Sequence, residues 1–162
     1  MRLDGKVVRG RGKGAGRIRA IADGLALELG SRPVAGTLNV ILSIPIEFDP
    51  REAIFRVDNK RLFWPVELNG VSCLAYRWKG CPLHIVEVVS VSHLRDELNL
   101  VDGSSVVIQA PHARHPSLKS LLAWTLLWAL RQRYYYASDA YILWTKGYPK
   151  IRKWAGQRYE KD

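Results

Sequence analysis

A glycine-rich segment near the N-terminus combines residue types that suit phosphate binding. It reads Arg9-Gly10-Arg11-Gly12-Lys13-Gly14-Ala15-Gly16-Arg17 and follows a short β-branched run. Glycines let backbone N–H groups approach and enclose phosphate oxygens, and the arginine and lysine side chains supply the opposite charge. The segment matches neither the Walker A pattern nor the dinucleotide fingerprint. Taken alone, it fits equally a flexible arginine- and glycine-rich arm that binds nucleic acid.

Two neutral oxygen donors, Thr37 and Asn39, form a second candidate site. They stand in Pro33-Val34-Ala35-Gly36-Thr37-Leu38-Asn39-Val40, where a turn leads into a strand. Residues i and i+2 of a strand share a face, so the threonine hydroxyl and the asparagine carbonyl point the same way. Such a pair can hold a hard cation such as Mg²⁺ that is neutralised mainly by bound phosphates. The alternative is a turn in which both side chains only bond backbone groups.

A lone carboxylate, Glu87, interrupts the apolar segment that runs from His84 to Val89. A charge at such a position must face solvent, a partner or a ligand. Ser92-His93-Leu94-Arg95 follows shortly afterwards. The alternative to a binding role is therefore a surface ion pair between Glu87 and Arg95.

In their order along the chain, the three fragments resemble the signature of the archaeal CTP-dependent riboflavin kinases. That signature has a GxGxG loop, a PxxGTLNV segment, a strand with a glutamate followed by an LR pair, and an LxLxDGxxV ending. The matching residues are Gly10–Gly14, Pro33–Val40, Glu87, Leu94-Arg95 and Leu98–Val106. The GTLNV stretch is the most specific part, and the resemblance covers residues 1–109.

The resemblance implies a phosphotransferase that moves the γ-phosphate of CTP to the 5′-hydroxyl of riboflavin and gives FMN, with Mg²⁺ as cofactor. Thr37 and Asn39 would hold the Mg²⁺, and Glu87 would lie on the flavin side. Catalysis would consist mostly of positioning and charge neutralisation, and no residue is identified as a general base. The residues implied to bind the nucleotide are Gly10, Arg11, Gly12, Lys13, Gly14, Ala15, Ser92, His93, Leu94 and Arg95.

The sequence departs from this family's pattern mainly on the acceptor side. A threonine expected there is absent, and Lys79 and Gly80 occupy the region. Ser90-Val91 replaces an alanine-proline pair, and Lys13 stands where the family's loop usually has an acidic residue. A related CTP-using kinase with a different acceptor is therefore an open alternative.

The elements that must position these residues are mainly β strands. Turn signals separate short runs, and Asn69-Gly70 between Arg61–Leu68 and Val71–Trp78 predicts a type I′ hairpin. Six or so strands with few helices favour a barrel or sandwich, and the resemblance narrows this to a six-stranded cradle-loop barrel of the riboflavin kinase type. Helical spacing predicts one short helix after the glycine-rich loop, over Ile18–Leu29. The other strand predictions are Lys6–Arg9, Leu38–Ile46, Ala53–Val57, His84–Val91 and Ser105–Gln109.

The character of the chain changes after Gln109, which divides it into a barrel over 1–109 and a basic, Trp- and Tyr-rich helical extension over 110–162. Residues 110–162 carry +7 of the net charge of +10. Ser117 is placed to cap a helix that runs towards Tyr136, and a basic, aromatic stretch follows over Tyr141–Trp154. Its tryptophans suit base stacking or a membrane interface, and packing on the barrel is the alternative. The apolar helix also allows a homo-oligomer.

Composition limits location and partners. Two cysteines are too few for a disulfide framework, the N-terminus has no signal-peptide core, and the apolar run Leu121–Leu130 is too short to span a bilayer. We therefore expect a cytoplasmic protein with no membrane span. The positive charge suits CTP phosphates, and it fits as an alternative a β-barrel module that binds nucleic acid.

Overall fold

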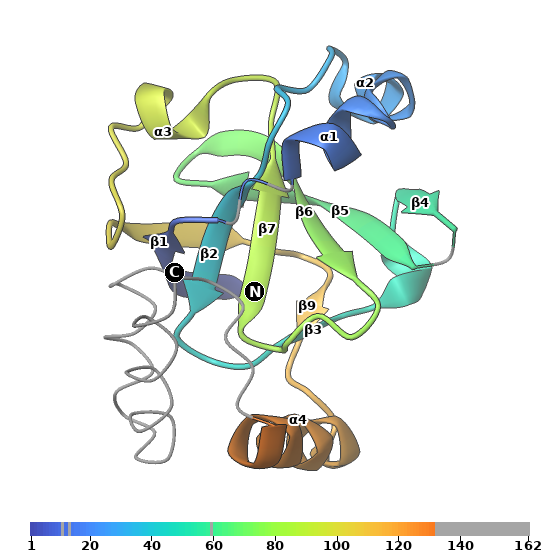
Figure 1. Cartoon of the computed structure of the whole chain (residues 1–162), viewed down its shortest axis with the longest axis vertical. Coiled ribbons are helices and arrows are strands. Elements are labelled where there is room, and N and C mark those ends of the chain that lie inside the picture. The colour runs from blue at the N-terminus through green and yellow to red at the C-terminus, as the bar shows by residue number, and fades with distance from the viewer. Residues whose placement is uncertain (11, 13, 59, 132–162) are drawn as a thin grey trace, which may run out of the picture.

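The computed structural model describes residues 1–10, 12, 14–58 and 60–131, and its centre is a closed antiparallel barrel (Figure 1). Neighbouring strands pair in the order β5-β6-β7-β2-β1-β8, and pairing of β5 with β8 closes the six-stranded barrel. This confirms the predicted mainly β fold and the closed barrel. The six strands are β1 (Arg2–Val8), β2 (Leu38–Leu42), β5 (Arg61–Leu68), β6 (Val71–Trp78), β7 (Ile85–Val89) and β8 (Ser105–Gln109).

The β5–β6 hairpin has the bounds that the sequence predicts. Asn69 and Gly70 connect the strands with φ angles of 48° and 87°, as a type I′ turn requires. The register pairs Leu68 with Val71 beside the turn and Arg61 with Trp78 at the far end. This hairpin fixes which side chains of β6 face outward.

The side chains that alternate along the strands form two hydrophobic clusters. The cluster inside the barrel includes Val40, Val66, Val86 and Ile108, all buried. The second cluster lies on the outer face, where the helices α1 (Gly14–Arg19) and α2 (Ala22–Leu29) pack. The inner face of the sheet is buried in the barrel, and the two helices cover part of the outer face. The cavity lies on the remaining part of the outer face.

The helix predicted over Ile18–Leu29 is two helices, and this prediction was wrong in its bounds. α1 begins at Gly14 and α2 begins at Ala22, with a break at Ala20 and Ile21. Ile18 in α1 and Leu25 in α2 are both buried in the outer cluster, so the break does not expose the apolar face. Gly30 ends α2 with a φ of 73°, as expected for a C′ glycine.

Several predicted strands are shorter than their apolar runs. The strand predicted over Leu38–Ile46 ends at Leu42 as β2. A separate strand, β3 (Glu47–Phe48), begins just after the predicted segment and pairs with β9 (Ala113–Arg114). β1 instead begins earlier than predicted, because its first residues pair with β8. The remaining short elements are η1 (Pro50–Glu52), β4 (Phe55–Val57) and α3 (Leu94–Glu97).

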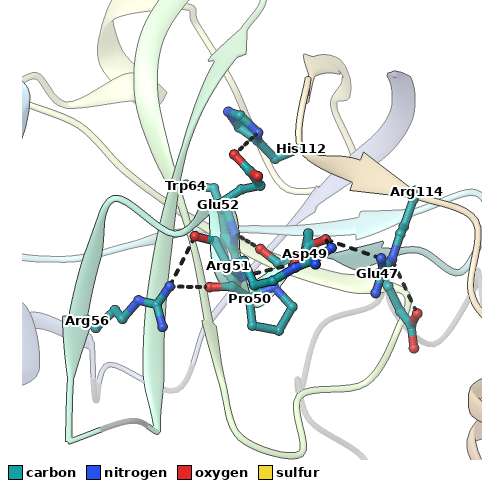
Figure 2. A network of polar contacts seen from close by, with 9 residues as sticks. All are labelled: Glu47, Asp49, Pro50, Arg51, Glu52, Arg56, Trp64, His112 and Arg114. Carbon is teal, nitrogen blue, oxygen red and sulfur yellow. Dashed lines mark hydrogen bonds and ion pairs between the residues drawn. The ribbon is translucent and has the colours of Figure 1, made fainter.

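A polar network joins the β3–β9 pair to the barrel (Figure 2). The Arg51 guanidinium donates to both carboxylate oxygens of Asp49, at 3.1 and 2.8 Å, and Arg114 lies 3.3 Å from the same carboxylate. The hydrogen bond from Arg51 is the main reason why the pKa of Asp49 lies well below its usual value. The indole of the buried Trp64 donates to the Asp49 carbonyl at 2.7 Å, which ties the network to the core.

The helix α4 (Leu118–Arg131) follows the barrel and contacts it through Trp124. Ser117 caps α4, since its hydroxyl accepts the Ser120 N–H at 3.1 Å, as predicted. The Trp124 indole donates to Nδ1 of buried His84 at 3.1 Å. Among the residues that the structure describes, none of the helices combines the length and the hydrophobicity that a membrane span needs. The predicted continuation to Tyr136 and the stretch Tyr141–Trp154 lie outside the described residues.

Burial of His84 predicts a pH-dependent loss of stability. Desolvation, together with the nearby Arg77 charge, lowers the pKa of His84 from 6.5 to about 3. The unfolded chain therefore binds one more proton than the native chain between these values, and stability falls as the pH drops from about 6.5 towards 3. Replacing His84 by Gln, which retains an acceptor for Trp124, should make this decline shallower by up to about 1.4 kcal/mol per pH unit in urea unfolding.

The matched control is His93→Gln, because His93 is exposed. This variant should decline with pH as the wild type does. Equal slopes for the wild type and His84→Gln between pH 6.5 and 4.5 would show that His84 does not titrate against folding.

Candidate functional site

A cavity of about 880 Å³ opens between the glycine-rich segment and the outer face of the barrel. Gly10, Gly12, Gly14 and Ala15 line one side of it. The strands and their flanking residues line the other side, and they follow the strand order of the sheet. From β6 to the segment before β8, these residues are Trp78, Glu87, Asn39, Arg9 and Asp102.

A row of paired residues crosses the outer face and changes from aromatic to polar. Cross-strand partners share a face, so each side chain in the row lies beside the next. The aromatic half lies in the outer hydrophobic cluster, and the polar half lines the cavity. In strand order the row is Phe55, Phe63, Tyr76, Glu87 and Asn39.

Thr37, Asn39 and Glu87 bring three oxygen atoms close together in the wall of the cavity. The Thr37 hydroxyl oxygen lies 2.9 Å from Glu87 Oε2 and 3.3 Å from Asn39 Oδ1. Ligands in adjacent positions of an octahedral Mg²⁺ site, each about 2.1 Å from the ion, are separated by about 3 Å. The distance between the Thr37 hydroxyl oxygen and Asn39 Oδ1 therefore suits two neighbouring ligands of one metal ion. The Thr37 hydroxyl would keep its hydrogen bond to the Glu87 carboxylate.

This oxygen set carries only one negative charge, so it suits a metal that arrives with anionic ligands. Among the described residues, no group of three or more His, Cys, Asp and Glu side chains is arranged to hold a metal by itself. A cation bound at Thr37 and Asn39 would need further charge from elsewhere, which a polyphosphate provides. The residues present fit a magnesium–phosphate complex better than a free ion.

The glycine-rich loop approaches the two oxygen donors so closely that side chains would not fit. A Cβ atom at Gly10 would lie 2.2 Å from Nδ2 of Asn39, and one at Gly14 would lie 2.9 Å from the Thr37 hydroxyl. Asn39 is only 6% exposed, so it has little room to move away. The loop and the strand thus converge on one place, as a shared phosphate and metal site requires.

Positive charge surrounds the cavity. Arg9, Arg17 and Arg95 all line it, against the carboxylates of Glu87 and Asp102. The Arg95 guanidinium is held in place by a hydrogen bond that it donates to the Val8 carbonyl at 3.2 Å. Guanidinium groups bind phosphate oxygens with directed hydrogen bonds. The described lining is therefore net positive and suits a polyanionic ligand.

The segment Ser92-His93-Leu94-Arg95 is only partly at the main cavity. Arg95 lines it, whereas Ser92, His93 and Leu94 line an adjoining pocket of about 200 Å³. Ser92 is engaged with the Glu97 carboxylate, and Leu94 is buried in the core. Arg95 alone of these four borders both spaces.

Tyr76 lies beside Glu87 at the aromatic half of the row. Burial, and then the Glu87 charge, raise the pKa of Tyr76, while a hydrogen bond with Arg17 acts in the opposite direction. Tyr76 therefore stays a neutral phenol near the carboxylate. The charges of Arg17 and Glu87 thus act in opposite directions on the pKa of Tyr76.

The structure brings together most, but not all, of the residues that the sequence singled out. The loop residues Gly10, Gly12, Gly14 and Ala15 share the cavity with Thr37, Asn39, Glu87 and Arg95. Arg11 and Lys13 lie outside the described residues. The sequence reasoning missed Trp78 as a lining residue. Strand alternation places Trp78 on the same face as Tyr76, two positions earlier in the predicted strand, but that this face borders the cavity follows from the pairing of β6 with β7.

Comparison of the chain with models of known protein families finds no match, and comparison with curated proteins also finds none.

Proposed function

We propose that the chain is a CTP-dependent kinase that phosphorylates the 5′-hydroxyl of riboflavin to give FMN, on a barrel of the cradle-loop type. The observation that carries this proposal is the meeting of two elements. The neutral oxygens of Thr37 and Asn39 lie 3.3 Å apart, and the side chains of both residues lie against the glycine-rich loop within one cavity. Phosphoryl transfer mainly needs such positioning and charge neutralisation.

The order of lining residues supports a cavity with two ends. In the middle lie Thr37, Asn39 and the glycine-rich loop, where the phosphates and Mg²⁺ would bind. One end is lined by Arg95, Leu100, Val101 and Asp102 and is assigned to the nucleoside. The other end is lined by Trp78 and Glu87 and is assigned to the acceptor.

In this proposal the residues of the chain hold the reactants and balance charge. When bound, Mg²⁺ neutralises charge on the phosphates. Glu87 accepts the Thr37 proton and so directs a lone pair of the hydroxyl oxygen towards the cavity. Arg9 and Arg17 balance the charge of the phosphates, and the acceptor hydroxyl approaches from the Glu87 side.

The donor and the acceptor are tested together. Purified protein is incubated with riboflavin, Mg²⁺ and each of the four common NTPs, and FMN is measured by chromatography. We expect FMN to form preferentially with CTP and to stop forming when EDTA removes the metal. Absence of phosphorylated flavin with every donor would overturn the acceptor assignment, and equal use of all four donors would overturn the cytidine assignment.

A nucleic-acid-binding barrel is the second candidate, favoured by the net charge of +10 and by the arginines around the cavity. It predicts oligonucleotide affinity that falls steeply with salt, because binding releases counterions. Fluorescence anisotropy at two salt concentrations separates the two functions. Tight, salt-sensitive binding that excess CTP does not reduce would favour the nucleic-acid function.

A further inference from the structure

Trp78 occupies the acceptor end of the cavity in a position that no motif explains. It is the last residue of β6, it is half-buried, and it lines the cavity together with Glu87. Strand alternation places Trp78 on the same outer face as Tyr76, which pairs with Glu87. An indole thus stands beside the polar half of the row, next to the carboxylate.

A row of aromatic rings supports Trp78 from behind. The centroids of Trp78 and Tyr76 are 6.1 Å apart, and Tyr76 stacks on Phe63 at 4.8 Å with an interplanar angle of 19°. Phe55 meets the edge of Phe63 at 5.6 Å. Because Phe63 and Tyr76 are buried, their positions restrict how far Trp78 can turn. The indole is therefore held in place before any ligand binds.

We propose that Trp78 is the platform on which a planar aromatic ring of the acceptor stacks, with the hydroxyl-bearing chain of the acceptor running past Glu87 towards Thr37. This inference rests on the proposed function, since it names the residue that would hold its acceptor. Aromatic pairs gain energy beyond the area they bury, so a flat conjugated ring is selected over an aliphatic alcohol. The charged groups of Glu87 and Arg17 lie in the same cavity and suit a polar chain attached to the ring.

The test measures ring binding separately from phosphorylation. Riboflavin is titrated with protein by isothermal titration calorimetry, which reports binding without relying on the indole that Trp78→Leu removes. Lumichrome serves as a second probe because it carries the tricyclic ring without the ribityl chain. The variants are Trp78→Leu, Trp78→Phe and, as a matched control, Trp124→Leu, because Trp124 does not line the cavity.

We expect Trp78→Leu to bind riboflavin and lumichrome about 5- to 20-fold more weakly than the wild type, in line with the usual loss when a stacking residue is removed. Trp78→Phe should retain most of the affinity, and Trp124→Leu should bind as the wild type does. The Michaelis constant for CTP should stay the same in Trp78→Leu, which separates loss of the platform from loss of the fold.

The outcomes distinguish this inference from the proposed function. Formation of FMN together with unchanged flavin binding by Trp78→Leu would overturn the platform and leave the kinase standing. Lumichrome binding that depends on Trp78, without FMN formation, would support the platform and overturn riboflavin phosphorylation. Absence of both binding and FMN would overturn both.

Discussion

The substitution Gly10→Ala is expected to slow the proposed phosphoryl transfer strongly while leaving the barrel folded. The added Cβ would lie 2.2 Å from Nδ2 of Asn39, far inside normal contact distance. Gly10 does not have a positive φ, so alanine itself fits the backbone there. The clash is therefore relieved by moving the Asn39 amide, which is buried and has little alternative space. A displaced carbonyl removes one of the two neutral oxygens from the proposed metal site.

Gly16 provides the matched control for this experiment. It lies in α1, close to Gly10 in sequence, and a Cβ atom there meets nothing within 4 Å. We expect Gly16→Ala to retain full activity, and Gly10→Ala to lose about 100-fold or more in kcat/KM with a melting temperature close to that of the wild type. Equal activities for the two variants would show that the contact between Gly10 and Asn39 is irrelevant to catalysis.

Removal of the Thr37 hydroxyl should have an effect of similar size. Thr37→Ala deletes the oxygen that lies within 3.3 Å of both Asn39 Oδ1 and Glu87 Oε2, and it leaves the backbone unchanged. We expect kcat/KM to fall by about 100-fold or more and the Mg²⁺ concentration needed for half-maximal activity to rise. Thr37→Ser keeps the hydroxyl and should retain most of the activity.

The metal titration is the decisive part of this second experiment. A purely structural role for the Thr37 hydroxyl would lower the stability of Thr37→Ala but not of Thr37→Ser, and it would leave the Mg²⁺ dependence of both variants unchanged. Activity of Thr37→Ala equal to that of the wild type at all Mg²⁺ concentrations would remove Thr37 from the proposed metal site.

Local patterns in the sequence were enough to predict a mainly β chain with a barrel or a sandwich, and the family resemblance narrowed this to a barrel. The Asn69-Gly70 pair defines a hairpin because few other residues accept two successive positive φ angles, and the strands on either side have the predicted bounds. The spacing of Thr37 and Asn39 likewise predicts that they share a face. Both inferences depend only on residues that are close together in sequence.

Features that depend on distant pairing could not be predicted in the same way. That Glu87 pairs with Asn39 on one side and with Tyr76 on the other follows from strand order, which no local pattern reports. The place of Trp78 at the cavity has the same origin. Ser92 was predicted to lie with the loop residues at one nucleotide site. In the structure its hydroxyl donates to the Glu97 carboxylate, and it lines the adjoining pocket instead of the main cavity.

The most direct measurement is a crystal structure of the protein with CTP and Mn²⁺ in place of Mg²⁺. We predict an anomalous manganese peak within direct coordination distance of the Thr37 hydroxyl and the Asn39 carbonyl, with the triphosphate enclosed by the Gly10–Gly14 loop. Manganese and triphosphate bound elsewhere, with Thr37 still bonded to Asn39 and Glu87 as it is now, would contradict the proposal.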